Sequence, residues 1–163
     1  MVEAHERFAN ELTRAGIEYV VVRPTGCFSD LAAFLSMAQS GRVWMIGSGD
    51  TRINPIHGQD LAAFCANATE EYSGVLEVGG PETLTQGEIA ETAFRAIDRP
   101  PRVSRIPLPA ARTGLALFGL VDRNRRDLAK FFVESAALDF VAPAYGSRRL
   151  AEHSRALVTG GSG

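Results

Sequence analysis

The spacing of hydrophobic and polar residues predicts a chain that alternates between helices and strands. Residues 2–15 place Phe8 and Leu12 on one apolar stripe at helical spacing, and Gly16 follows as a stop signal. Residues 18–22 contain three consecutive valines, a β-branched run that is typical of a strand covered on both faces in a parallel sheet. We therefore expect a central strand at 18–22, with Phe8 and Leu12 of the preceding helix packed over it.

The rest of the chain continues this alternation. The pattern predicts helices over 30–39, 58–67, 86–97, 108–120 and 125–137, strands over 42–46, 75–78 and 103–106, an irregular edge segment over 53–56, a last extended segment over 138–143, and a short helix or tail over 147–154. Strands that alternate with helices indicate an α/β fold with a parallel sheet. A length of 163 residues suits one domain, so we expect a partial Rossmann-like parallel sheet with a small α/β subdomain toward the C-terminus.

Polar residues at the predicted helix starts supply candidate caps. Thr85 and Glu88 have the spacing of a capping box, in which each side chain accepts a hydrogen bond from the other residue's backbone N–H. Ser29 or Asp30 can cap the helix at 30–39. Either Asp60 or the turn at 58–59 can cap the helix at 58–67.

The residues that follow the valine run are the main candidates for ligand binding. Pro24 has no backbone N–H, so the strand is expected to end at Arg23-Pro24. Thr25 and Gly26 then form a loop at the carboxyl end of a predicted parallel strand. In open α/β sheets, ligands bind at this end of the strands.

Four segments in order, at 5–8, 23–28, 54–62 and 78–82, resemble the extended and atypical short-chain dehydrogenase/reductases. They read His-Glu-Arg-Phe, Arg-Pro-Thr-Gly-Cys-Phe, Asn-Pro-Ile-His-Gly-Gln-Asp-Leu-Ala and Val-Gly-Gly-Pro-Glu. The resemblance implies NAD or NADP as cofactor and hydride transfer to or from a small carbonyl or hydroxyl substrate. It also implies that the loop of Pro24, Thr25, Gly26 and Phe28 meets the nicotinamide side of the dinucleotide.

Two features of that family are absent from their usual places in this sequence. The glycine-rich strand–turn–helix and the Tyr-x-x-x-Lys pair would both precede the helix at 2–15. The chain therefore resembles the C-terminal, substrate-side half of such a protein (residues 1–154), and we expect it to be inactive alone and to bind NAD(P) weakly. A non-catalytic dinucleotide-sensing regulator and an inert interaction module are the alternatives.

Few side chains in the sequence suit acid–base or metal chemistry. His57 is the candidate acid–base group, because histidine titrates near neutral pH. Asp60, by resemblance, heads a helix and anchors loops by hydrogen bonds, and we expect a structural role for it. The histidines and the two cysteines are scattered without metal-ligand spacing, so no metal site is predicted.

The C-terminus at 155–163 has two interpretations. Its Val-Thr-Gly-Gly-Ser-Gly sequence resembles a first strand and the start of the family's glycine-rich fingerprint, with Gly160 and Gly163 as the first two cofactor-binding glycines. The alternative is a flexible Gly/Ser tail. The fingerprint interpretation would add a truncated phosphate-binding turn to the chain.

Composition narrows the expected partners and compartment. A net charge of −2 gives no reason to expect nucleic acid or a membrane surface as a partner. Two cysteines and no secretory signal suit a reducing cytoplasm. Missing strands would leave an unpaired sheet edge, so we expect a homodimer, with a small molecule as the other partner.

Overall fold

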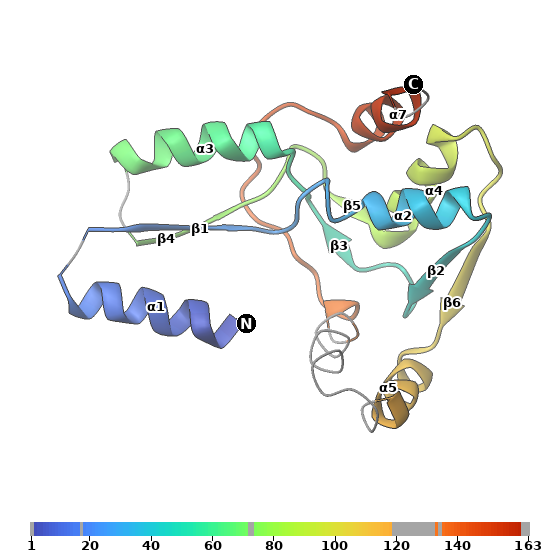
Figure 1. The fold of residues 1–163 in the computed structure, drawn as a ribbon, viewed down its shortest axis with the longest axis horizontal. Helices are drawn as coiled ribbons and strands as arrows, with labels where there is room; N and C mark the ends of the chain where they lie inside the picture. The colour runs from blue at the N-terminus through green and yellow to red at the C-terminus, as the bar shows by residue number, and fades with distance from the viewer. Residues whose placement is uncertain (1, 17, 72–73, 119–132, 134, 161–163) are drawn as a thin grey trace.

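The computed structural model describes residues 2–16, 18–71, 74–118, 133 and 135–160 (Figure 1). The elements in chain order are α1 (Val2–Arg14), β1 (Val20–Pro24), α2 (Ala32–Gln39), β2 (Val43–Ile46), β3 (Arg52–Ile53), α3 (Gly58–Glu71), β4 (Gly74–Val78), β5 (Leu84–Thr85), α4 (Gln86–Ala96), β6 (Val103–Ile106), α5 (Leu108–Phe118) and α7 (Leu150–Gly160). The order of predicted elements is confirmed through α5, apart from the two-residue strand β5, which the sequence did not predict. Most of the helix predicted at 125–137 lies outside the described residues.

The strands form three separate pairs. β1 pairs with β4 in parallel, with Val20 opposite Gly74, and β2 pairs with β6 in parallel, with Val43 opposite Val103. β3 and β5 form a short antiparallel pair. Helices α1 and α3 lie on opposite sides of the β1–β4 pair (Figure 1). The parallel pairs and their helical connections confirm the predicted α/β, Rossmann-like fold.

The valine strand β1 is less buried than the sequence indicates. Val20, Val21 and Val22 are each half-buried, and β4 is the one strand that pairs with β1 among the described residues. The prediction of a central strand buried on both faces is therefore wrong for this chain. β1 ends at Pro24, within the predicted Arg23-Pro24 stop and two residues beyond the range 18–22.

Helix α1 does not bury its phenylalanine. The side chain of Phe8 is 64% exposed, whereas Ala9 is buried and Leu12 is half-buried. The prediction that Phe8 packs over the strand is wrong, because the helix turns a different stripe toward the rest of the molecule.

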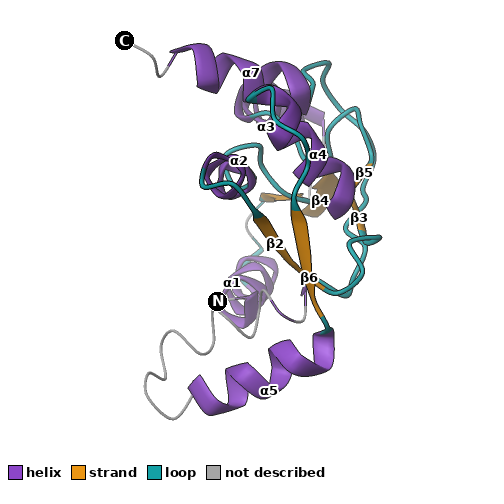
Figure 2. Cartoon of the chain, turned by 90° about the vertical axis from the view of Figure 1, so that its right-hand side faces the viewer, coloured by secondary structure: helices purple, strands orange, loops and turns teal. Residues whose placement is uncertain are grey.

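The main hydrophobic core lies between the β2–β6 pair and the helices α2 and α4 (Figure 2). The largest fully buried side chain is Phe94, which packs with Val43 and Met45 of β2. Successive residues of β2 alternate between buried and more exposed positions, so Val43 and Met45 face the helices while Trp44 faces solvent.

One predicted helix cap is confirmed, and two differ from the structure. Thr85 and Glu88 form the capping box of α4. Helix α2 instead begins after Leu31, which has no side-chain cap bond, and Asp30 accepts a hydrogen bond from the Cys27 backbone N–H. At the start of α3, the cap is the imidazole of His57, whose Nδ1 accepts a hydrogen bond from the Gln59 N–H at 3.2 Å.

The C-terminal part of the described chain is helical. Helix α7 runs from Leu150 to Gly160, so residues up to 160 form neither the strand nor the flexible tail considered above. Gly163 lies outside the described residues. The helix also crosses the boundary at 154 that separates the two predicted segments.

Candidate functional site

The candidate ligand-binding loop is fixed at the carboxyl end of β1 by hydrogen bonds from two other segments. The Thr25 N–H donates to the carbonyl of Val78 at the end of β4 (3.0 Å), and its hydroxyl donates to the carbonyl of Asn54 (2.7 Å). Ile56 donates its N–H to the Gly26 carbonyl at 2.8 Å and accepts the Phe28 N–H at 3.1 Å. The loop is therefore held as a short continuation of the sheet.

Two backbone groups of this loop have no hydrogen-bond partner within the described residues. Because Gly74 donates to Tyr19 and Thr25 donates to Val78, the alternation of a parallel ladder turns the Pro24 carbonyl away from β4. Neither this carbonyl nor the Gly26 N–H has a hydrogen-bond partner among the described residues. A carbonyl acceptor and an N–H donor are the groups that would bond an amide of a ligand.

Asn54 joins three parts of the chain behind this loop. Its side chain is 2% exposed, and its Nδ2 donates to the carbonyls of Gly80 (3.2 Å) and Ala142 (2.8 Å). Its Oδ1 accepts the Ala142 N–H at 3.0 Å. A Cβ atom at Gly79 would lie 2.1 Å from Nδ2 of Asn54, so this amide needs a glycine there. Asn54 was not predicted as a site residue.

Asp60 anchors the segment that leads into α7. Its carboxylate accepts the N–H groups of Ser147 and Arg148, each at 3.1 Å, and pairs with the Arg148 guanidinium. Burial alone would raise the pKa of Asp60, but the Arg148 and Ser147 N–H groups and the Arg148 guanidinium together lower it. The geometry confirms that Asp60 anchors a loop, although the loop is distant in sequence and Asp60 does not cap its own helix.

Phe28, His57 and His153 form an aromatic cluster beside the loop. The ring centroids are 5.5 Å apart for Phe28 and His57, 5.4 Å for Phe28 and His153, and 5.1 Å for the two imidazoles. Since Nδ1 of His57 is a hydrogen-bond acceptor, the proton of the neutral ring is on Nε2. Burial, and then the neighbouring His57, lower the pKa of His153, so His153 is neutral at pH 7.

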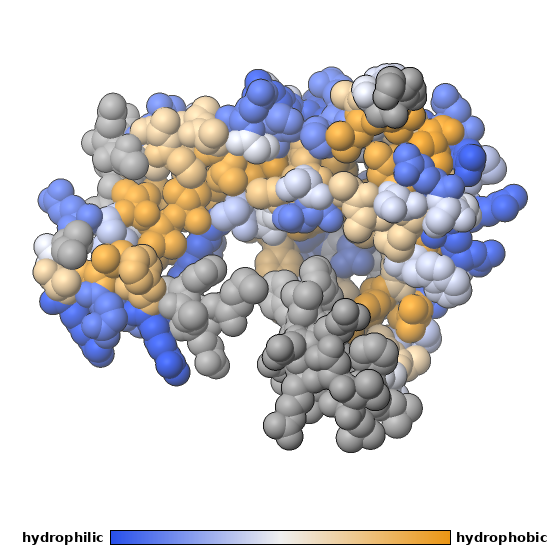
Figure 3. All heavy atoms as spheres, viewed as in Figure 1, coloured by the Kyte–Doolittle hydropathy of each residue, from blue (hydrophilic) through white to orange (hydrophobic). Residues whose placement is uncertain are grey.

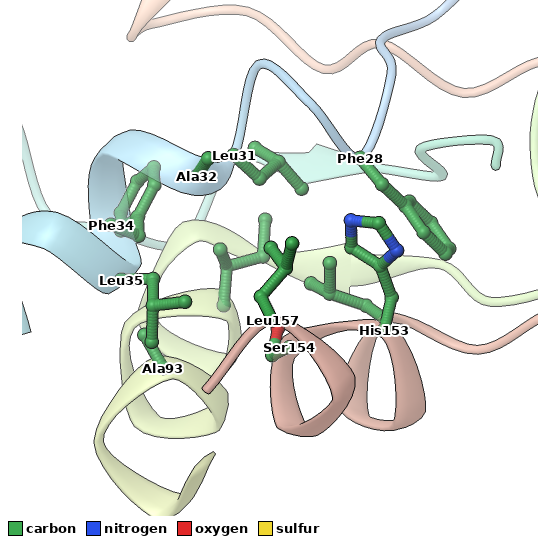
Figure 4. A pocket seen from close by; sticks show the side chains of 11 residues that line it. Phe28, Leu31, Ala32, Phe34, Leu35, Ala93, His153, Ser154 and Leu157 are labelled. Atoms are coloured by element: carbon green, nitrogen blue, oxygen red, sulfur yellow. The ribbon is translucent and has the colours of Figure 1, made fainter. Parts of the chain in front are cut away.

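A shallow crevice continues from this cluster between α2, α4 and α7 (Figure 4). His153 and Leu157 of α7 face it from one side, and Leu31 and Leu35 face it from the other. The crevice is narrow and its lining is mostly apolar, so it leaves little room for a substrate.

The other polar residues near the loop have limited chemistry. Burial, and then the charge of Asp30, raise the pKa of Cys27, so this thiol stays protonated and is a poor nucleophile. No group of three or more potential metal ligands occurs in the described part of the chain. None of the described helices is long and apolar enough to cross a membrane.

The structure brings together most of the residues that the sequence singled out. Thr25, Gly26 and Phe28 lie in one loop, and the Phe28 ring contacts His57. Gly160 is exposed. It lies about 10 Å from His153 along the axis of α7, at a rise of 1.5 Å per residue. His153 was missed because its closeness to His57 depends on the path of the whole C-terminal segment.

Comparisons with curated proteins add sequence similarity to this picture. The chain is 34% identical over 110 residues to the chloroplastic divinyl chlorophyllide a 8-vinyl-reductase of Zea mays, a match that covers 63% of this chain and 27% of that protein. It is 29% identical over 104 residues to mitochondrial NADH dehydrogenase [ubiquinone] 1 alpha subcomplex subunit 9 of Arabidopsis thaliana, covering 61% and 24%. The matched part is about a quarter of the length of these relatives. No family model matches the chain.

Solved structures share the fold over nearly the whole chain. AtPrR2 with NADP+ and (+)pinoresinol has a TM-score of 0.71 at 16% identity, covering 94% of this chain and 55% of that one. NADPH-dependent quinone oxidoreductase QOR2 of Escherichia coli, complexed with NADPH, has a TM-score of 0.64 at 18% identity, covering 91% and 56%. These likenesses show that the chain has the Rossmann-like fold of these NADP(H)-bound proteins, and it is similar in sequence to part of the maize reductase.

This similarity agrees with the resemblance drawn from the four segments. It does not test the expected substrate-side role, cofactor contacts or inactivity, because the matched part is about a quarter of the length of these relatives. Those relatives are described as chloroplastic and mitochondrial, and a cytoplasmic location for this chain stays a prediction.

Proposed function

We propose that this chain is the substrate-side part of an NAD(P)-dependent reductase, and that the loop from Pro24 to Phe28 faces the nicotinamide ring. The observation that carries the proposal is that the Pro24 carbonyl and the Gly26 N–H, at the carboxyl end of β1, have no hydrogen-bond partner within the described residues. Thr25, through its bonds to Asn54 and Val78, holds these groups in place.

The cofactor would supply a hydride to a small organic substrate. Reduction also requires a proton, and the protonated ring of His57, which contacts Phe28 of the loop, is the candidate donor. His57 would then regain a proton from solvent. His153 and Phe28 pack against this ring and restrict its orientation. The similar divinyl reductase and quinone oxidoreductase have reductase names, which favours a reductase over an epimerase.

Titration of the isolated chain with NADH and NADPH, followed by amide NMR, tests the loop assignment. Without a pyrophosphate-binding turn in the described part of the chain, we expect weak binding, with a dissociation constant of roughly 1 mM. The shifts should concentrate on Thr25, Gly26 and Phe28, with Trp44 on the exposed face of β2 as an internal control. Shifts elsewhere, or none, would reject the loop as a nicotinamide contact.

A second candidate is a sensor that binds the dinucleotide without turnover. It is favoured by the small number of acid–base groups near the loop, where His57 and His153 are the candidates within the described residues. Joining this chain to the N-terminal part of the maize relative and measuring NADPH oxidation separates the two. A reductase should lose kcat in the His57→Gln variant without a matching change in the KM for NADPH, whereas a sensor should show no turnover in either form.

A further inference from the structure

A hollow outside the candidate loop lies where β2 and β6 begin. Its volume is about 270 Å³, and it is lined by Gly41, Phe94, Arg99, Pro100 and Arg102. These residues come from the turn between α2 and β2, from α4, and from the connection between α4 and β6. None of them belongs to α1 or β1, which lie on the other side of the molecule in Figure 1. The hollow therefore uses no part of the candidate loop.

The lining of this hollow is mostly apolar. Phe94 is 1% exposed and packs in the main core with Val43, so it gives the hollow a fixed floor. The exposed Pro100 adds a second rigid ring. The volume lies just below the range of about 300–1,000 Å³ that is common for small-molecule pockets. A single ring or a short chain would fill it.

Two exposed arginines, Arg99 and Arg102, stand at the rim of the hollow, and we call them the rim arginines. The side chain of Arg102 makes no hydrogen bond or ion pair within the described residues. Arg99 donates from Nη1 to the Gln39 carbonyl at 3.2 Å, which uses one of the several N–H donors of its guanidinium group. Both rim arginines therefore keep donors for a ligand.

No carboxylate in the described part of the chain pairs with the rim arginines. Asp98 precedes Arg99 in sequence but does not line the hollow. A third arginine, Arg42, donates to the Ser104 hydroxyl at 2.6 Å and also lacks an ion pair there. Figure 3 shows hydrophilic residues along this side of the molecule, at the right of the view. In a chain with a net charge of −2, this rim is locally positive.

The ends of α2 and α4 meet beside the hollow and do not account for Arg102. The carbonyl end of a helix carries partial negative charge, which attracts cations. Here the Ala38 carbonyl accepts the Gly41 N–H at 2.9 Å, and the Phe94 carbonyl accepts the Arg99 N–H at 3.1 Å. Because the backbone closes both helix ends, neither end needs the Arg102 guanidinium as a cap.

We propose that this hollow binds a small organic carboxylate, with the carboxylate on the rim arginines and the apolar body against Phe94 and Pro100. A guanidinium group bonds a carboxylate through two parallel N–H···O bonds. A phosphate group brings three acceptor oxygens and more charge, which suits a mostly apolar lining less well. The inference concerns a separate site and does not depend on the proposed function.

Titration of the wild-type chain with benzoate and with benzyl alcohol, followed by amide NMR, tests this site. The two probes share a ring, and benzoate alone carries a charge. We expect a dissociation constant of roughly 1 mM for benzoate, shifts at Gly41, Phe94 and Arg99, and binding of the alcohol at least about 10-fold weaker. Equal binding of the two probes would overturn the proposal, because charge would then play no part. Tighter binding of phenyl phosphate than of benzoate would overturn the choice of a carboxylate.

Arginine variants decide whether the rim makes the contact. Arg102→Gln should weaken benzoate binding at least about 10-fold, and Arg102→Lys, which keeps the charge without the planar group, should lie between the two. Arg105→Gln is the matched control, since Arg105 is exposed on β6 and does not line the hollow, and its affinity should be unchanged. Circular dichroism confirms that the variants are folded. Unchanged affinity in Arg102→Gln, or wild-type shifts confined to other residues, rejects the site.

Discussion

Asp60 and Arg148 are 88 positions apart in sequence, yet the carboxylate of Asp60 accepts both the backbone N–H and the guanidinium of Arg148. This pair ties the start of α3 to the segment that leads into α7. Gly146 belongs to the same arrangement, because a Cβ atom there would lie 2.3 Å from Oδ2 of Asp60.

Replacing Asp60 by alanine should destabilise the protein by about 1–3 kcal/mol, because the Ser147 and Arg148 N–H groups lose their acceptor in a buried site. The pKa of Asp60 is lowered on folding, so its stabilisation is complete above the unfolded value of about 3.9 and is lost as the pH falls through the folded value. Urea unfolding between pH 7 and acid should show the wild type and variant converge at low pH.

The control for this series is Glu91→Gln, which removes an exposed carboxylate that lies 4.0 Å from Arg95. Its stability should stay within about 0.5 kcal/mol of the wild type. An Asp60→Ala protein as stable as this control would show that the anchor contributes nothing.

Replacing Asn54 by alanine should cost about 1–3 kcal/mol, because the Gly80 and Ala142 groups that it bonds would be left without partners in the interior. Asn67→Ala is the matched control, since Asn67 is exposed and bonds one tyrosine hydroxyl. Thermal unfolding of both variants gives the comparison. Equal losses would contradict the role assigned to the buried amide.

Replacing Phe8 by alanine should change stability by less than about 0.5 kcal/mol, because the side chain is 64% exposed. The buried Phe94 should cost about 3–5 kcal/mol when changed in the same way. Denaturant midpoints of the two variants measure the difference. A large loss for Phe8→Ala would mean that α1 packs against the strands in solution.

Removal of the imidazole at position 57 should raise the pKa of His153, because His57 is one of the two causes that lower this pKa. The rise should be partial, since burial is the larger cause and remains. NMR titration of the His153 ring in a His57→Gln variant measures this change. A pKa that does not move would show that the two rings do not sense each other.

The sequence predicts local structure here better than it predicts the site. The capping box of α4 follows from two residues three positions apart, and β6 from a short β-branched segment. The exposure of Phe8 could not be predicted, since the 3.6-residue period indicates an apolar stripe but not what covers it. The prediction of a strand or a flexible tail at the C-terminus was wrong up to residue 160, because α7 continues through residues whose composition suits a loop.

The site residues that sequence reasoning missed depend on long-range contacts. His153 meets His57 only after α7 is in place, and the bonds of Asn54 to Ala142 join positions 88 apart. No spacing along the chain carries such information. Pro24, Thr25 and Gly26 could be found because a strand, a proline and a glycine loop are consecutive.

The two long-range anchors also set the order in which the chain can fold. Asn54 with Ala142, and Asp60 with Arg148, each close a loop of 88 positions, and closing a long loop requires its entropy cost to be met before the contact forms. On the ribosome, both anchoring side chains emerge well before their partners do. The side chains of Asn54 and Asp60 therefore stay hydrated until most of the following chain has been synthesised, and only then can they form their buried contacts.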